Sequence, residues 1–229
     1  MNEGQSDERS REEIGAEVNE RLVLRSAGPH ALLAEFEDIQ QVRDYYAESQ
    51  RRLAAHQLPA GIELVPAACT LLFDGIDGID DRAALARDLR TWRPAPVSAR
   101  EARQLELPTV YDGPDLPDVA ELWGMTVAEV VQTHADLVHE VAFIGFAPGF
   151  AYISGIPPTL RVPRRSRPRA RVATGSVALA DQFTGVYPRE SPGGWQLVGR
   201  TTVRTWNPDS EPAAYFVPGD RVRFVPVAP

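Results

Sequence analysis

The chain has 229 residues, 43% of them hydrophobic, which is enough to fill one large core or two modest ones. No apolar run approaches the roughly 18 residues that a membrane-spanning helix needs, and the start of the chain is acidic and polar, unlike a signal peptide. We therefore expect a cytoplasmic protein in which residues 1–20 form a disordered acidic tail. The single cysteine, Cys69, excludes an internal disulfide and a multi-cysteine zinc cluster, and we expect it to be a small buried hydrophobe.

All 24 basic residues are arginine, so the chain contains no lysine. A Schiff-base lysine and a Walker-type phosphate loop are thereby excluded. Any phosphate or carboxylate must be bound by arginine side chains, backbone amides or a partner protein. Residues 161–171 (RVPRRSRPRAR) carry six arginines and no acid, although the net charge of the chain is −8. This loop is either a solvated surface loop or a site for an anion or an acidic partner.

The first half of the chain alternates strand and helix patterns. The order β-α-β-β-α-β is typical of a ferredoxin-like domain, with two helices on one face of an antiparallel sheet. Asp38 and Gln41 have the spacing of a capping box at the start of the first helix. The predicted strands are 30–36, 61–66, 69–73 and 103–108. One predicted helix begins at Asp38, and a second covers 81–92. The predicted domain spans 21–108.

The pattern of residues 118–137 predicts two short helices around Gly124. This arrangement is similar to a DNA-binding helix-turn-helix. No arginine occurs between residues 104 and 160, whereas acidic residues are frequent there. Because DNA affinity depends on neutralising phosphates, we expect no nucleic-acid binding and a helix pair packed on the domain that follows. His134 and His139 are five residues apart and lack a metal-ligand motif, so we expect packing histidines and no metal site.

From residue 141 onward, glycine and proline separate about seven short strand patterns, which predicts a closed β-barrel. The most unusual of these segments is FIGFAPGFAYISGIP, residues 143–157. Its glycines and prolines favour a strand followed by a shaped loop. The loop is either a tight barrel corner with core aromatics or part of a ligand-binding cleft.

Three glycine-proline segments together, GFAPGFAYISG, RVATGSVALADQFTGVYP and SPGGWQLVGRT, resemble the family of the B subunit of 5-oxoprolinase, also called allophanate hydrolase subunit 1. The family includes sporulation-kinase inhibitors and is similar to one half of the carboxyltransferase domain of urea carboxylase. The resemblance covers nearly the whole chain. It implies an α+β protein with a ferredoxin-like N-terminal domain and, over 109–229, a cyclophilin-like barrel preceded by the helix pair.

The resemblance also implies a function: one component of an ATP-dependent 5-oxoprolinase, a hydrolase that opens a lactam to form L-glutamate. ATP with Mg²⁺ would bind through the complex, and the partners would be the C subunit and the lactam-utilisation A subunit, because no residue here is an obvious general base. Two alternatives stay open: another ATP- or biotin-linked amide or urea enzyme, or a non-catalytic inhibitor of a histidine kinase.

Carried onto matching positions, the family's motifs give the candidate residues for binding substrate or nucleotide. Arginines and glycine amides would hold phosphoryl oxygens, and aromatic faces would stack on a five-membered ring. Arg165 matches no motif position and is expected to face water. The family usually has proline at Ala173 and glutamine at Phe183, so this chain lacks an amide that would bind a polar substrate. The candidates are Gly145, Phe146, Pro148, Gly149, Phe150, Tyr152, Arg164, Arg169, Ser176, Thr184, Tyr187, Ser191, Gly193, Gly194, Trp195 and Arg200.

Overall fold

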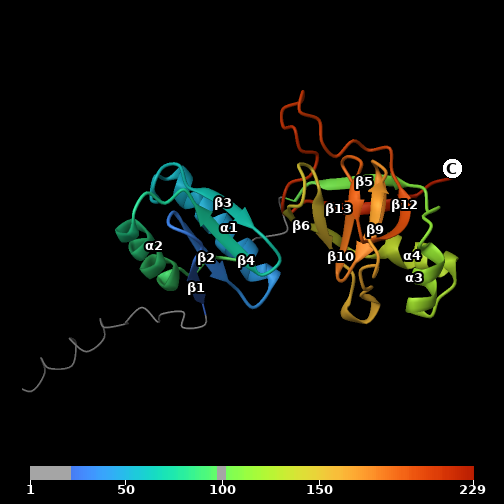
Figure 1. Cartoon of the computed structure of the whole chain (residues 1–229), viewed down its shortest axis with the longest axis horizontal. Coiled ribbons are helices and arrows are strands. Elements are labelled where there is room, and N and C mark those ends of the chain that lie inside the picture. The colour runs from blue at the N-terminus through green and yellow to red at the C-terminus, as the bar shows by residue number, and fades with distance from the viewer. Residues whose placement is uncertain (1–21, 97–101) are drawn as a thin grey trace, which may run out of the picture. The chain divides into compact units, whose positions relative to one another are not determined.

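The computed structural model describes residues 22–96 and 102–229, which form two compact α+β units divided after Pro96 (Figure 1). The acidic tail expected at residues 1–20 lies outside the described residues. Within the described ranges, no helix combines the length and the apolar character that crossing a membrane requires.

The first unit is a four-stranded sheet with two helices. Its strand order is β1-β2-β4-β3, and β2 pairs antiparallel with both β1 and β4. Its core contains Phe73 from the sheet together with Tyr45, Leu85 and Leu89 from the helices. Its elements are β1 (Val23–Ser26), β2 (Ala31–Glu35), α1 (Ile39–Ala54), β3 (Glu63–Pro66), β4 (Thr70–Asp74) and α2 (Ile79–Thr91).

Local signals in this unit give the structure that the sequence predicts. The Asp38 side chain accepts a hydrogen bond of 2.9 Å from the Gln41 backbone amide and so caps α1. Leu85 and Leu89 are the buried residues of α2, and Trp92, which directly follows the helix, is buried as well. The expectation for Cys69 is wrong: it is exposed in the turn between β3 and β4, where its carbonyl accepts from the Phe36 amide at 2.8 Å.

The strand predicted at 103–108 forms, but it belongs to the second unit. This strand, β5 (Gln104–Thr109), pairs in parallel with β13 (Arg221–Pro226), and Leu107 lies opposite Phe224 in the barrel core. The edge position beside β2 is taken instead by β1. The boundary expected after residue 108 therefore lies earlier, because alternation predicts a strand without identifying the strand with which it pairs.

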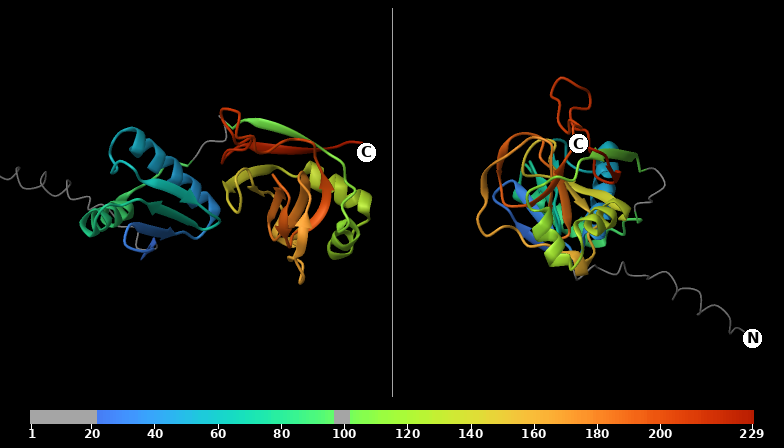
Figure 2. Two further views of the ribbon diagram at one scale, coloured as in Figure 1. Left: turned by 45° about the horizontal axis from the view of Figure 1, so that its top comes forward. Right: turned by 90° about the vertical axis from the view of Figure 1, so that its right-hand side faces the viewer.

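The second unit is a barrel-like sheet of seven strands in the order β12-β9-β10-β7-β6-β13-β5 (Figure 2). The two ends of this order meet where Val110 and Arg200 exchange backbone hydrogen bonds of 2.9 and 2.8 Å. The sheet is thus nearly closed, as the strand pattern predicts. Besides β5 and β13, its strands are β6 (His139–Ile144), β7 (Ala151–Ser154), β9 (Ser176–Ala180), β10 (Phe183–Val186) and β12 (Gln196–Arg200).

The remaining elements of this unit cover or extend the barrel. The short strands β8 (Arg169–Val172) and β11 (Ser191–Gly193) pair with each other, and a short 3₁₀ helix spans Pro158–Leu160. The predicted helix pair is α3 (Leu116–Trp123) and α4 (Val127–Asp136). Gly124 ends α3 with φ of 64°, and Thr126 and Glu129 form a capping box on α4. Side chains of both helices join the barrel core, as expected.

Candidate functional site

The GFAPGF segment is a tight turn between β6 and β7. The Gly145 amide donates to the Phe150 carbonyl at 3.1 Å, and the Phe150 amide donates to the Ala147 carbonyl at 2.9 Å. Gly149 has φ of +77°, and a Cβ there would lie 2.6 Å from Trp206 Cβ, so only glycine fits. The core-aromatic interpretation holds for Phe150, which is buried in the barrel, whereas Phe146 is 62% exposed, and the ligand-cleft interpretation stays a prediction.

Phe146 has an uncommon backbone conformation, with φ of +67°. Bulky side chains rarely occupy this left-handed region, and such residues concentrate at functional sites. The Phe146 ring meets the ring of Phe150 edge-on at 5.3 Å between centroids and that of Tyr187 at 6.5 Å. The turn therefore holds an exposed aromatic ring beside a buried aromatic cluster.

A small pocket of about 90 Å³ opens beside this turn. Phe150 is one of its lining residues, and its ring centroid is 5.3 Å from those of both Tyr187 and Trp195. A Cβ at Gly193 would overlap the Tyr187 hydroxyl, so glycine is needed for the ring to lie against the backbone. Eight of the sixteen candidate residues meet here. The lining residues are Phe146, Phe150, Tyr152, Arg164, Tyr187, Pro192, Gly193, Gly194 and Trp195, which we call the aromatic pocket.

Arg164 supplies the positive charge of the aromatic pocket, and no salt bridge within the described ranges involves it. Burial raises the pKa of the Tyr187 phenol, while a hydrogen bond from the Trp195 backbone and the charge of Arg164 act in the opposite direction. Tyr187 is thus a neutral phenol at physiological pH. The pocket is lined by aromatic rings, two glycines, one proline and one guanidinium, which suits a small anion.

Two other arginines of the basic loop have a structural partner instead. The Asp115 carboxylate accepts a hydrogen bond of 2.5 Å from Arg165 and two of 2.8 Å from Arg169. It also accepts a bond of 2.7 Å from the Leu197 amide of β12, and Asp115 is only 1% exposed. The expectation that Arg165 faces water is therefore wrong, and Arg169 is engaged by Asp115, which raises its pKa. We call this set the Asp115 clamp.

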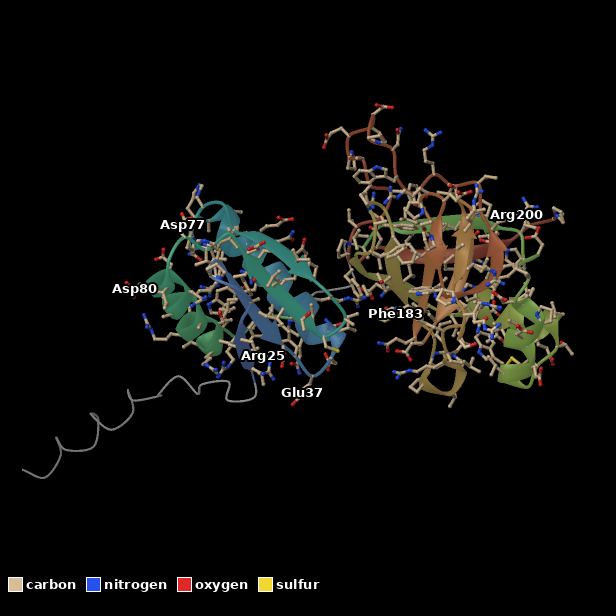
Figure 3. All side chains as sticks on the ribbon, viewed as in Figure 1. Arg25, Glu37, Asp77, Asp80, Phe183 and Arg200 are labelled. Atoms are coloured by element: carbon tan, nitrogen blue, oxygen red, sulfur yellow. The ribbon has the colours of Figure 1, made fainter. Side chains whose placement is uncertain are left out.

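The remaining candidates lie outside the aromatic pocket. Arg200, labelled in Figure 3, is at the end of β12 and bonds Asp112 at 2.9 Å. The Ser176 carbonyl accepts from the Tyr187 amide at 3.0 Å, so its contribution is backbone pairing. Ser191 lies in β11 beside β8. Gly145, Pro148 and Gly149 belong to the turn itself.

Thr184 belongs to a buried polar network that the sequence does not predict. The His134 ring bonds the Tyr111 hydroxyl at 2.7 Å through Nδ1 and the Thr184 hydroxyl at 3.0 Å through Nε2. His139 bonds the His134 carbonyl at 2.8 Å, so the chain turn after α4 brings both histidines together. Burial lowers the pKa of both rings, most strongly that of His134. The packing role expected for the histidines is confirmed, and no sequence signal connects them with Tyr111.

Comparisons with known proteins agree on one family. Residues 22–216 match the family model described as carboxyltransferase domain, subdomain C and D. The chain is 42% identical over 146 residues to the B subunit of 5-oxoprolinase from Escherichia coli O157:H7, covering 62% of this chain and 67% of that protein. It is 33% identical over 211 residues to the B subunit of 5-oxoprolinase from Haemophilus influenzae, covering 91% and 95% of the two chains.

The crystal structure of TTHA0988 has the same fold over most of this chain. The TM-score is 0.74 and the identity is 33%, over 90% of this chain. The matched region is 40% of TTHA0988, so this chain corresponds to less than half of that longer protein.

Proposed function

The chain belongs to the family of the carboxyltransferase domain, subdomain C and D, and from this premise we propose that it is the B subunit of an ATP-dependent 5-oxoprolinase, a complex that converts 5-oxo-L-proline to L-glutamate. The observation that carries the proposal is the alignment with proteins named as B subunits of 5-oxoprolinase over nearly the whole chain, at 33% identity and 91% coverage for one of them. The proposal places the protein in the cytoplasm.

The finer description of the fold is part of the same proposal. The first unit is a variant of the ferredoxin-like fold in which β1 replaces the strand that would follow α2. The second unit is a cyclophilin-like barrel with the helix pair at its start. The order β1-β2-β4-β3 supports the first assignment, since only the origin of one edge strand differs.

We propose that the aromatic pocket holds part of the substrate. The rings of Phe146, Phe150 and Tyr152 contact the flat lactam ring, and Arg164 with the amides of Gly193 and Gly194 binds the carboxylate or a phosphoryl group. Its volume of about 90 Å³ is well below the roughly 300 Å³ at which ordinary ligand sites begin. A partner surface is therefore required to complete the site.

The reaction has three steps. Transfer of the γ-phosphoryl group of ATP to the lactam oxygen releases ADP and makes the lactam carbon electrophilic, and water then attacks that carbon. The carbon–nitrogen bond breaks as the amine takes a proton, which leaves an acyl phosphate, and a second water hydrolyses the acyl phosphate to phosphate and the side-chain carboxylate of glutamate. This chain binds and orients the ring; the C subunit, together with the A subunit, supplies the general base and the rest of the site for ATP with Mg²⁺. We assign no metal ligand to this chain.

Reconstitution tests the proposal. The purified chain is assayed with and without the C and A subunits from the same source, with ATP and 5-oxo-L-proline, and glutamate is measured. We expect ATP-dependent glutamate formation in the full mixture and none from the chain alone. Turnover by the chain alone would refute the partner requirement. A full mixture that hydrolyses an open-chain amide such as allophanate, and leaves 5-oxoproline intact, would refute the proposed substrate.

A further inference from the structure

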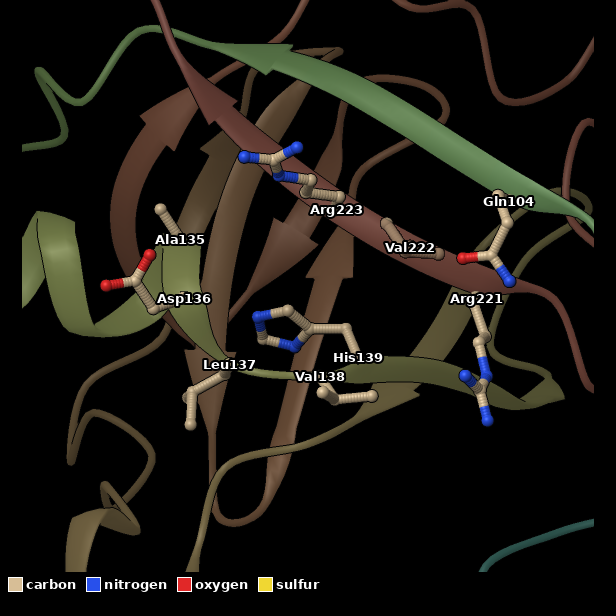
Figure 4. Close-up of a pocket in the computed structure, with 9 residues that line it drawn as sticks. All are labelled: Gln104, Ala135, Asp136, Leu137, Val138, His139, Arg221, Val222 and Arg223. Carbon is tan, nitrogen blue, oxygen red and sulfur yellow. The ribbon is translucent and has the colours of Figure 1, made fainter. Parts of the chain in front are cut away.

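A second and larger pocket of about 320 Å³ lies in the barrel unit, at the end of α4 (Figure 4). None of the sixteen candidate residues lines it. We call it the α4 pocket, and its lining comes from the segment joining α4 to β6, from β13 and from the start of β5. The lining residues are Gln104, Ala135, Asp136, Leu137, Val138, His139, Arg221, Val222 and Arg223.

One side of the α4 pocket is electronegative. Asp136 is the last residue of α4, and its Oδ2 atom accepts a hydrogen bond of 2.7 Å from Gln132. Ala135 and Leu137 place the end of the helix in the same wall. The last carbonyls of a helix have no partner within it and carry a partial negative charge, so this end favours a cation.

The wall formed by β13 is electropositive. Arg221 and Arg223 are two residues apart on β13, so their side chains leave the same face of the sheet. Gln104 is the parallel partner of Arg221, and Figure 4 shows Gln104 and Arg221 across the pocket from Asp136. Arg223 is 3.7 Å from the exposed Glu106, a loose pairing of two solvated groups. Glu140 of β6 is the antiparallel partner of Arg221.

The pocket also has apolar surface between these charges. Val138 is 74% exposed at its rim, whereas Val222 is buried. An exposed valine beside separated charges of opposite sign suits a ligand whose methylene groups connect an ammonium group and a carboxylate. The complementary ligand of such a pocket is a zwitterion.

We propose that the α4 pocket binds a free acidic α-amino acid. The ammonium group faces Asp136 and the end of α4, and the carboxylates face Arg221, Arg223 and the Gln104 amide. Two cations and one anion in the lining are the complement of two carboxylates and one ammonium group. The choice of L-glutamate rests on the proposed function, since glutamate is the product of that reaction, and the pocket is then a product-binding site separate from the aromatic pocket.

Isothermal titration calorimetry on the full chain, without partners or ATP, tests the proposal. The ligands are L-glutamate, glutarate, which lacks the ammonium group, and 5-oxo-L-proline, whose nitrogen is uncharged. We expect saturable binding of glutamate, and at least about tenfold weaker binding of the other two. The highest glutamate concentration is about 10 mM, roughly ten times a millimolar dissociation constant. Absence of glutamate binding at that concentration would overturn the proposal. Equal binding of glutarate and glutamate would also overturn it.

Variants locate the site. Arg221→Gln and Asp136→Asn should each weaken glutamate binding by at least about tenfold. Arg87→Gln, which removes an exposed arginine from α2 in the other unit, is the matched control and should leave it unchanged. Thermal melts of each variant are the control for correct folding. Glutamate binding that both pocket variants retain in full would place the ligand elsewhere and refute the inference.

The two proposals fail separately. Glutamate binding by the chain, with no 5-oxoproline hydrolysis by the reconstituted complex, would refute the proposed function and retain the α4 pocket. Hydrolysis of 5-oxoproline by the complex, together with no glutamate binding by this chain, would retain the proposed function and refute the α4 pocket as a glutamate site.

Discussion

Replacement of Asp115 by alanine should destabilise the barrel unit more than any change of an exposed charge. The substitution leaves the guanidinium groups of Arg165 and Arg169 without their carboxylate and the Leu197 amide without its acceptor. Removing one member of a buried ion pair costs about 3–5 kcal/mol, and an unsatisfied buried amide costs about 1–3 kcal/mol. Water reaches the two arginine side chains, which are 32% and 25% exposed, and reduces the first cost.

We therefore expect Asp115→Ala to lower the free energy of unfolding by about 3 kcal/mol. Asp115→Asn keeps an oxygen for the Leu197 amide and loses the charge, so its effect should be about half as large. The matched control is Asp118→Ala, because that carboxylate is 64% exposed and 4.0 Å from Arg165. Its effect should stay within about 0.5 kcal/mol.

Urea unfolding followed by tryptophan fluorescence measures these differences. Trp123 and Trp195 report on the barrel unit, and Trp92 reports on the first unit. The slope of the transition must stay constant for the comparison to be valid. A loss below about 1 kcal/mol for Asp115→Ala, or an equal loss for Asp118→Ala, would show that the clamp contributes little and that the basic loop is held by other contacts.

Three further outcomes are expected. Gly193→Ala should lower the melting temperature, because the new methyl group overlaps the Tyr187 hydroxyl at a cost of about 1–3 kcal/mol; an unchanged melting curve would contradict the geometry of the aromatic pocket. In the reconstituted complex, Arg164→Gln should reduce kcat/KM for 5-oxoproline by about 30-fold or more, equivalent to about 2 kcal/mol, whereas Arg171→Gln, which changes an exposed arginine of the same loop, should not; equal losses would indicate a diffuse electrostatic effect. The two buried histidines have lowered pKa values, so below about pH 6.5 the unfolded chain takes up protons that the folded chain does not, and stability should fall by up to about 1.4 kcal/mol per pH unit for each histidine. Urea midpoints between pH 7.5 and 5.5 measure this fall, and a constant midpoint would contradict it.

Features with a local cause can be predicted well from the sequence. The caps at Asp38 and Thr126 depend on residues three positions away, and the helix ending at Gly124 depends on one left-handed residue. The pattern at 104–109 predicts a strand but not its partner, because β13 is more than 100 residues away in the sequence. Short alternating segments fit several sheet edges equally well, and the core that accepts Leu107 decides among them.

The candidate site shows the same difference between residues that sequence motifs identify and residues that only long-range contacts bring together. The residues of the aromatic pocket come from motifs shared with a family, whereas the Asp115 clamp joins residues 50 and 54 positions apart and has no sequence signature. In the sequence, Asp115 is only one of several acids in an acidic stretch. The clamp changes the interpretation of the basic loop, because two of its six arginines balance a buried carboxylate while Arg164 has no such partner among the described residues.

The departure at Phe183 acts through packing. Phe183 is 7% exposed, and its ring meets those of Phe143 and Tyr152 edge-on at 5.8 and 5.6 Å between centroids. Phe183 itself does not line the aromatic pocket, whereas Tyr152 does. Phenylalanine, where the resemblance leads us to expect glutamine, therefore extends the aromatic cluster behind the pocket, and the polar groups of the lining are supplied by other residues. Phe183 contacts the pocket lining through Tyr152, and Arg164, Gly193 and Gly194 belong to that lining whichever residue stands at position 183.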